Sequence, residues 1–245
     1  MTYILVGDFM TARYLPALAA LLGLTGCVME RDPGGPAQYF SQSVEPDNSE
    51  EVRVDLRMGA GDLQVTDGAQ KLVRADFTYN IPAWKPEVKY TREGNRGTLT
   101  IVQPGSSHTT VMGKTQYRWD LQLNNKVPMD LNVNFGAGKA RLDLGSLMLR
   151  GVELNMGVGQ MEMDLRGKVR HSYNVSIHGG VGEATIRLPV DAGIYAEAHG
   201  GIGSINVRGL RHEGGHWVSD SYEQAENKIR IDVEGGIGAI KLIAD

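Results

Sequence analysis

Two consecutive stretches decide the fold: Leu131–Leu144, LNVNFGAGKARLDL, and Val152–Leu165, VELNMGVGQMEMDL. Both place a Gly-x-Gly unit at the same point, with apolar and polar residues alternating on either side. This alternation has the period of a β-strand that buries one face. The unit occurs six times, with its first glycine at Gly59, Gly136, Gly157, Gly180, Gly201 and Gly236.

The spacing of these units predicts a repeat architecture. From the second unit onward, successive first glycines lie 21, 23, 21 and 35 residues apart. In every unit the residue between the glycines is apolar, and so are the residues three and five positions before the first glycine and four and six positions after it. We therefore predict an all-β fold, a single-sided parallel β-solenoid with coils of about 21 residues. All these apolar positions should face the core, and the outward glycines should permit a sharp bend.

The N-terminus has the pattern of an export signal. The apolar stretch Leu15–Leu24 follows Arg13, which fits a signal peptide and is too short to span a bilayer. The sequence Leu-Thr-Gly-Cys that ends at Cys27 resembles a bacterial lipobox. That resemblance implies lipidation of Cys27, and Val28 after it resembles the outer-membrane sorting pattern. Translation from Met1 or from Met10 would give the same mature protein.

The chain divides into four predicted parts: a signal peptide at 1–26, a flexible tether at 27–50, a β section with an antiparallel insertion at 51–130, and the solenoid at 131–245. The tether is rich in Pro, Gly, Ser and acidic residues and lacks apolar periodicity. The strands expected in the insertion are Lys71–Tyr79, Glu87–Arg92, Gly97–Val102 and Tyr117–Leu123. The last unit should form an uncapped C-terminal coil, whose edge could pair with another protein or form a dimer.

Composition argues against several classes of function. The net charge is −4, and no run of Lys or Arg is present, which argues against nucleic-acid binding. The Gly-x-Gly units are followed by strand patterns rather than by a helix, so they do not predict a dinucleotide site. No Gly-x-Ser-x-Gly motif occurs. We expect no cofactor and no enzymatic activity.

One outward column carries the most interesting polar side chains. It lies two positions before the first glycine and contains Arg57, Asn134, Asn155, His178, His199 and Glu234. His178 and His199 are expected in adjacent coils, about 4.8 Å apart. Together with Glu234 they form a candidate binding ladder that could chelate a transition metal. The alternative, a solvent-exposed polar ladder without metal, is the one we favour.

A second column places carboxylates side by side. Asp143 and Asp164 occupy the same position in adjacent units, as the two carboxylates of a glycosidase would require. The alternative is a charge ladder in which Asp164 pairs with Arg187, and Arg141 pairs with Glu162. We favour the charge ladder because short turns between coils provide no walls for a desolvated site.

The long interval before the last unit contains a candidate contact loop. It reads GLRHEGGHW from Gly209 to Trp217 and includes His212 and His216. This excursion could fold over a face of the solenoid. The sequence equally allows it to contact a partner through His212, His216 and Trp217.

The two stretches quoted at the start are similar to the toast-rack domains, over roughly residues 50–245. That family includes bacterial envelope proteins of unknown function and LiaF-like cell-wall-antibiotic-response proteins, and the resemblance contributes no catalytic residues. Together with the lipobox, this resemblance implies a lipid-anchored envelope protein, on the outer membrane facing the periplasm or at the cell surface. We expect a non-catalytic binding, adhesion or scaffolding module that contacts the membrane through Cys27 and either another envelope protein or cell-wall glycan. The alternatives are a carbohydrate-active enzyme and an envelope-stress sensor.

Overall fold

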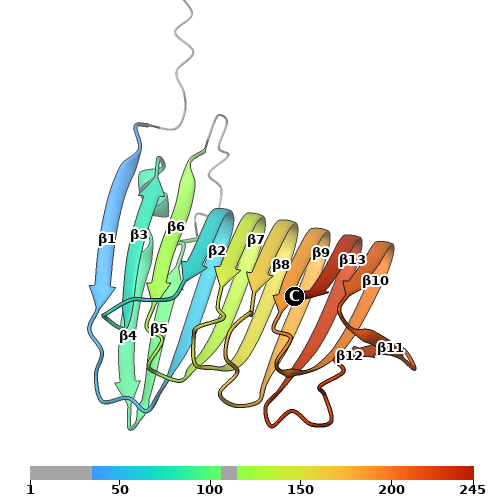
Figure 1. Cartoon of the computed structure of the whole chain (residues 1–245). Coiled ribbons are helices and arrows are strands. Elements are labelled where there is room, and N and C mark those ends of the chain that lie inside the picture. Colours follow the sequence, from blue (N-terminus) through green and yellow to red (C-terminus); the bar gives the residue numbers. More distant parts are fainter. Residues whose placement is uncertain (1–34, 106–114) are drawn as a thin grey trace, which may run out of the picture. The chain divides into compact units, whose positions relative to one another are not determined.

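The computed structural model of the protein describes residues 35–105 and 115–245. The repeat units form six long strands, and shorter strands lie at both ends of this stack (Figure 1). The long strands are β2 (Glu51–Thr66), β7 (Met129–Asp143), β8 (Leu149–Asp164), β9 (Tyr173–Leu188), β10 (Gly193–Arg208) and β13 (Lys228–Ala244). The short strands are β1 (Gln38–Val44), β3 (Val73–Tyr79), β4 (Glu87–Glu93), β5 (Arg96–Val102), β6 (Tyr117–Leu123), β11 (Arg211–Glu213) and β12 (His216–Val218). A 3-10 turn, η1, spans Pro82–Trp84.

The six long strands form one parallel stack in the order β2, β7, β8, β9, β13, β10. They align in the register of the repeat, with the second glycine of each unit opposite that of its neighbours. This arrangement confirms the predicted parallel solenoid. Columns of Val, Leu, Ile and Met on the inner face make up most of the core.

Each long strand bends at its Gly-x-Gly unit, and the bends lie in one row along the stack (Figure 1). The second glycine of each unit has φ between +128° and +149°, a conformation that residues with side chains rarely adopt. At Gly159 a Cβ atom would also overlap the carbonyl oxygen of Gly138 in the neighbouring strand. Glycine is therefore required both by the backbone conformation and by the close stacking.

The residue between the two glycines departs from the prediction. We expected it to face the core, but Val158, Val181, Ile202 and Ile237 are 52%, 44%, 72% and 51% exposed. The positive φ of the following glycine interrupts the regular alternation of the strand. The bend consequently turns this residue outward, where it forms an exposed aliphatic row.

The position directly before the first glycine changes character along the stack. From β2 to β10 it is occupied by Met58, Phe135, Met156, Gly179, Gly235 and Gly200. The three large side chains are buried beneath the bends. The three glycines leave an apolar cavity of about 230 Å³ beneath the other bends, lined in part by Met156, Ile205 and Ile240.

The last strand in sequence is not the last strand of the stack. β13 pairs with β9 on one side and with β10 on the other. At the two inward positions before the bend, β13 carries Ile231 and Val233, whereas β10 carries Ala196 and Ala198. Because β13 lies between β9 and β10, its larger aliphatic side chains have apolar neighbours on both sides.

This order corrects the predicted C-terminal edge. The edge strand of the stack is β10, which pairs with β12 only through Tyr195 and Ala196. From His199 to Arg208 that side of β10 has no strand partner among the described residues. An expectation of dimerisation through the C-terminal coil therefore loses its structural basis.

The other end of the stack is covered by short strands that pair antiparallel with one another, while β5 and β6 run parallel to β2. The four strands predicted in the insertion are present as β3, β4, β5 and β6, and β5 and β6 each pair with part of β2. Residues 38–44, which we assigned to the tether, form β1 and pair with β3. The apolar contact of Phe40, whose ring lies 5.6 Å from that of Phe77, gives this segment a physical reason to be ordered.

The predicted boundary at residue 131 also differs from the structure. β2, in the section predicted as 51–130, is the first strand of the repeat stack rather than part of a separate section. The signal peptide and Cys27 lie outside the described residues, so their assignment remains a prediction. Within the described residues, no helix has the length and apolar character needed to cross a membrane.

Candidate functional site

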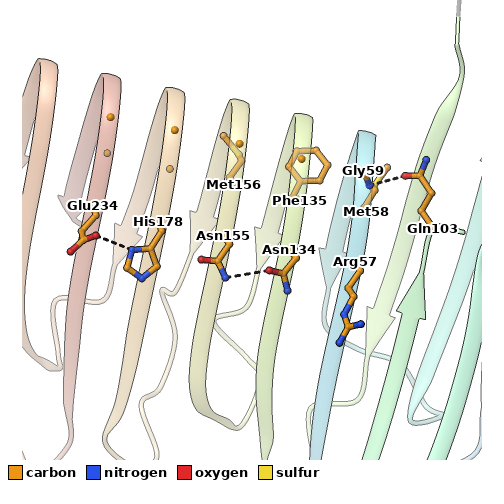
Figure 2. Close-up of a pocket in the computed structure, with 16 residues that line it drawn as sticks. Arg57, Met58, Gly59, Gln103, Asn134, Phe135, Asn155, Met156, His178 and Glu234 are labelled. Atoms are coloured by element: carbon orange, nitrogen blue, oxygen red, sulfur yellow. Dashed lines mark hydrogen bonds and ion pairs between the residues drawn. The ribbon is translucent and has the colours of Figure 1, made fainter. Parts of the chain in front are cut away.

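A shallow polar groove crosses five of the stacked strands beside the bends (Figure 2). Its volume is about 860 Å³. The first glycines of the units line it, and the side chains two positions before them line it as well: Arg57, Asn134, Asn155, His178 and Glu234. Four inter-strand spacings give the groove a length of about 19 Å.

Hydrogen bonds between neighbouring strands hold these side chains in a row (Figure 2). The Asn155 amide donates to Asn134 Oδ1 at 3.3 Å, and His178 Nδ1 lies 3.1 Å from Glu234 Oε2. At the other end, Gln103 Oε1 accepts from the Gly59 backbone N–H at 2.7 Å. The row is therefore partly preorganised, while the Asn amides keep further donors and acceptors for a ligand.

Arg57 and Glu234 give the two ends of the groove opposite charge. Arg57 makes no hydrogen bond or ion pair with any described residue, so its guanidinium is available to a ligand. Gln103 was missed by the sequence analysis because it follows β5 in the insertion. No repeat position could have placed it beside Gly59.

The structure separates the two predicted histidines. Glu234 of β13 lies in register between His178 of β9 and His199 of β10. The histidines are therefore two inter-strand spacings apart, roughly 10 Å, rather than one. The second ring nitrogen of His178 lies 3.1 Å from Ser176 Oγ, so both nitrogens have protein partners. His178, His199 and Glu234 thus do not form the three-ligand ladder that we considered.

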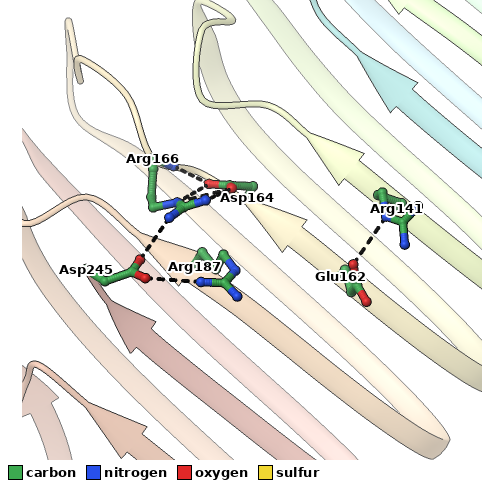
Figure 3. A network of polar contacts seen from close by, with 6 residues as sticks. All are labelled: Arg141, Glu162, Asp164, Arg166, Arg187 and Asp245. Carbon is green, nitrogen blue, oxygen red and sulfur yellow. Dashed lines mark hydrogen bonds and ion pairs between the residues drawn. The ribbon is translucent and has the colours of Figure 1, made fainter.

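One of the two aspartates of the alternative enzyme site, Asp164, belongs to a network of ion pairs (Figure 3). Asp164 accepts from Arg166 at 2.6 Å and 3.0 Å, and Arg166 also reaches Asp245 at 3.3 Å. Arg187 pairs with Asp245 at 3.1 Å, instead of with Asp164 as predicted. The other predicted pair, Arg141 with Glu162, is present at 3.2 Å.

The pKa values of the two aspartates move in opposite directions. Hydrogen bonds from Arg166 hold the pKa of Asp164 below its usual range. Partial burial raises the pKa of Asp143, and the nearby negative charge of Asp164 adds to that shift. Both carboxylate oxygens of Asp164 accept hydrogen bonds from Arg166, so Asp164 is engaged as an ion-pair partner, and we do not propose a glycosidase.

These shifts predict opposite effects of two substitutions on stability. A lowered pKa stabilises the fold above the unfolded-state pKa of about 4 and stops doing so as pH falls through the folded value. A carboxyl whose pKa is raised by folding, such as Asp143, has the reverse effect. It favours the folded state at low pH, and that stability is lost as the pH rises through its pKa in the folded protein. At pH 7, Arg166→Gln should lower the urea midpoint. Asp143→Asn should instead stabilise by a few tenths of a kcal/mol after solvent screening.

Urea denaturation at pH 7 and at pH 2.5 checks both predictions, the loss of stability in Arg166→Gln and the gain in Asp143→Asn. Lowering the pH moves both carboxyls toward their protonated forms, so the two differences should shrink together. A midpoint for Asp143→Asn below that of the parent protein at pH 7 would contradict the proposed repulsion.

The candidate contact loop folds back onto the stack as the hairpin β11–β12. The ring of His216 stacks on Tyr195 of β10 at 4.6 Å, and His212 lies 5.1 Å from Trp217. β12 pairs with β10 and extends the sheet. The hairpin thus extends the edge of the sheet instead of covering a face, and the contact role of His212, His216 and Trp217 stays a prediction.

Comparison with known families and structures gives two overlapping family matches. Residues 34–187 match the family described as the N-terminal domain of toast-rack. Residues 137–242 match the family described as the C-terminal domain of LiaF, of the cell-wall-active antibiotics response. No curated protein matches the chain.

One solved structure supports the same fold. A protein from Clostridium sporogenes ATCC 15579, provisionally named a cell adhesion protein, is 32% identical with a TM-score of 0.83, over 86% of this chain and 100% of that one. A protein from Bacteroides fragilis NCTC 9343, provisionally named an adhesin, is 13% identical with a TM-score of 0.24. That second match covers 86% of this chain and 99% of the other, and supports no argument at so low a score.

Proposed function

The chain belongs to the toast-rack family, and on that premise we propose that it is a non-catalytic binding module of the cell envelope, lipid-anchored through Cys27. We propose further that its polar groove binds an extended glycan strand of the cell wall. The observation that carries this proposal is the row of outward polar side chains above a floor of glycines, which crosses five strands.

The chemistry of the groove suits a glycan. Its amide and charged side chains present hydrogen-bonding groups at a regular spacing of about 4.8 Å. An extended chain with hydroxyl and amide groups can contact several of them at once. The glycine floor allows such a chain to approach the backbone closely. The apolar side chains that also line the groove, Met58, Phe135 and Met156, are buried beneath the bends.

The family and the leader sequence support the proposed location. The C-terminal family match concerns a cell-wall-active antibiotics response, and the similar protein from Clostridium sporogenes is provisionally named for cell adhesion. Both names concern the cell envelope. Two or more acyl chains on Cys27 would hold the protein on a membrane stably. The same LiaF match supports a role in envelope stress as a second candidate function.

The groove is tested by removing its two central amides together. Asn134→Ala with Asn155→Ala should weaken binding to soluble peptidoglycan glycan strands by about tenfold or more, since each amide hydrogen bond contributes about 1 kcal/mol. Isothermal titration of untagged protein with these strands measures the affinity. The control is Asn206→Ala, which removes an exposed amide from β10, away from the groove.

The control variant should bind like the parent protein. If the parent protein fails to bind peptidoglycan strands at millimolar concentration, the glycan proposal is wrong. Equal affinities of the double variant and the parent protein would show that binding does not use this groove.

A further inference from the structure

A separate group of metal-ligating side chains lies at the β10 end of the stack. Glu197 and His199 belong to β10, and Asp232 of β13 is directly opposite Glu197 in the strand register. One imidazole nitrogen and one oxygen from each carboxylate all lie within 4.8 Å of one another. We propose that Glu197, His199 and Asp232 bind a divalent transition-metal ion, with Zn²⁺ as the ion that fits best.

The two carboxylates lack a cationic partner. Neither Glu197 nor Asp232 forms an ion pair with Lys or Arg in the described parts of the chain. At the equivalent position on β2, by contrast, Asp55 pairs with Arg53 at 3.0 Å. Like charges directly opposite each other on adjacent strands destabilise the pairing. A bound cation would replace this repulsion with attraction to both side chains.

The hydrogen bonds around the group leave ligand atoms available. Asp232 Oδ1 is buried and has no hydrogen-bond partner. Leaving such an oxygen unsatisfied costs free energy, and coordination to a cation would satisfy it. The Tyr195 hydroxyl donates to Glu197 Oε1 at 2.6 Å, which orients the carboxylate as partners of metal ligands commonly do. The exposed ring of His199 makes no hydrogen bond with a described residue.

The donor set selects the class of metal. Zn²⁺ accepts imidazole nitrogen and carboxylate oxygen at about 2.0–2.2 Å, and three protein ligands leave a fourth position for water. Calcium and magnesium prefer oxygen ligands alone, so the imidazole favours a transition metal. Ligand atoms around a tetrahedral ion are about 3.4 Å apart. Rotation of the exposed His199 side chain can supply the necessary approach.

The sequence places two of these ligands at one repeat position, but it does not show that their strands are neighbours. Glu197 and Asp232 occupy the same position, four residues before the first glycine, in the last two units. They become neighbours only because β13 inserts beside β10. A metal bound there would link the edge strand, β10, to its neighbour in the sheet, β13.

The proposal is tested by titrating Zn²⁺ into the untagged, metal-free protein. We expect one Zn²⁺ per chain, with an affinity at least tenfold greater than for Ca²⁺. His199→Ala and Asp232→Asn should each weaken Zn²⁺ binding at least tenfold. Circular dichroism of both variants should match that of the parent protein, since His199 is exposed and Asp232→Asn preserves shape.

His178→Ala is the matched control. It removes the other histidine of the outward column, two strand spacings away, and should leave the Zn²⁺ affinity within twofold of the parent value. Absence of Zn²⁺ binding at 1 mM would overturn the proposal. So would a loss of affinity in His178→Ala equal to that in His199→Ala. Because no glycan enters the measurement, its outcome is independent of the proposed function.

Discussion

Gly159→Ala is expected to lower the free energy of unfolding by about 4 kcal/mol or more, enough to prevent folding of a marginally stable domain. Gly159 has φ of +141°, and a Cβ there would overlap the carbonyl oxygen of Gly138. The unfavourable backbone conformation alone costs about 1–3 kcal/mol. Relief of the overlap would require two stacked strands to separate at their bends. Urea denaturation of the purified variant measures the loss.

Gly94→Ala separates the two contributions. Gly94 lies in the turn between β4 and β5 with φ of +62°, and a Cβ there would meet no atom within 4 Å. This variant should lose only about 1–2 kcal/mol, the conformational cost alone. Equal losses in the two variants would show that close stacking of the glycines contributes nothing.

Ile231→Asp is expected to destabilise the protein by more than about 4 kcal/mol, because it places a charge at a position that is 0% exposed. Ile231 lies in β13, which pairs on both sides with other strands. The damage should therefore spread to β9 and β10 rather than remain at the C-terminus. Hydrogen exchange should show loss of amide protection in all three strands, and urea denaturation gives the magnitude.

Ile237→Asp is the same substitution on the same strand, at a bend position that is 51% exposed. Its cost should be below about 1 kcal/mol, as for other exposed positions. If both variants were equally destabilised, the bend residue would be part of the core, as the period-two pattern predicted. Loss of protection confined to β13 in Ile231→Asp would contradict the interior position of that strand.

Much of the site could be anticipated from the repeat. The outward column from Arg57 to Glu234 follows from parity alone, because alternate residues of a strand face opposite sides. The structure turns that column into one wall of a groove over five strands. Gln103, which reaches the groove from the insertion, has no repeat position and could not be placed. The alternation of the strand also does not show that Asp164 pairs with Arg166 instead of with Arg187.

The sequence by itself determined the unit and its stacking: strand, bend, glycine positions and parallel register. These follow from local sterics and from a two-residue period that recurs in every unit. Only the tertiary structure decided the order of the strands, the outward turn of Val158 and its counterparts, and the ordering of residues 38–44. The physical reason is that the repeat units are nearly identical, so the edge of each strand could pair with the edge of any other. The choice between them then depends on contacts between residues far apart in sequence, such as burial of Ile231 between two strands.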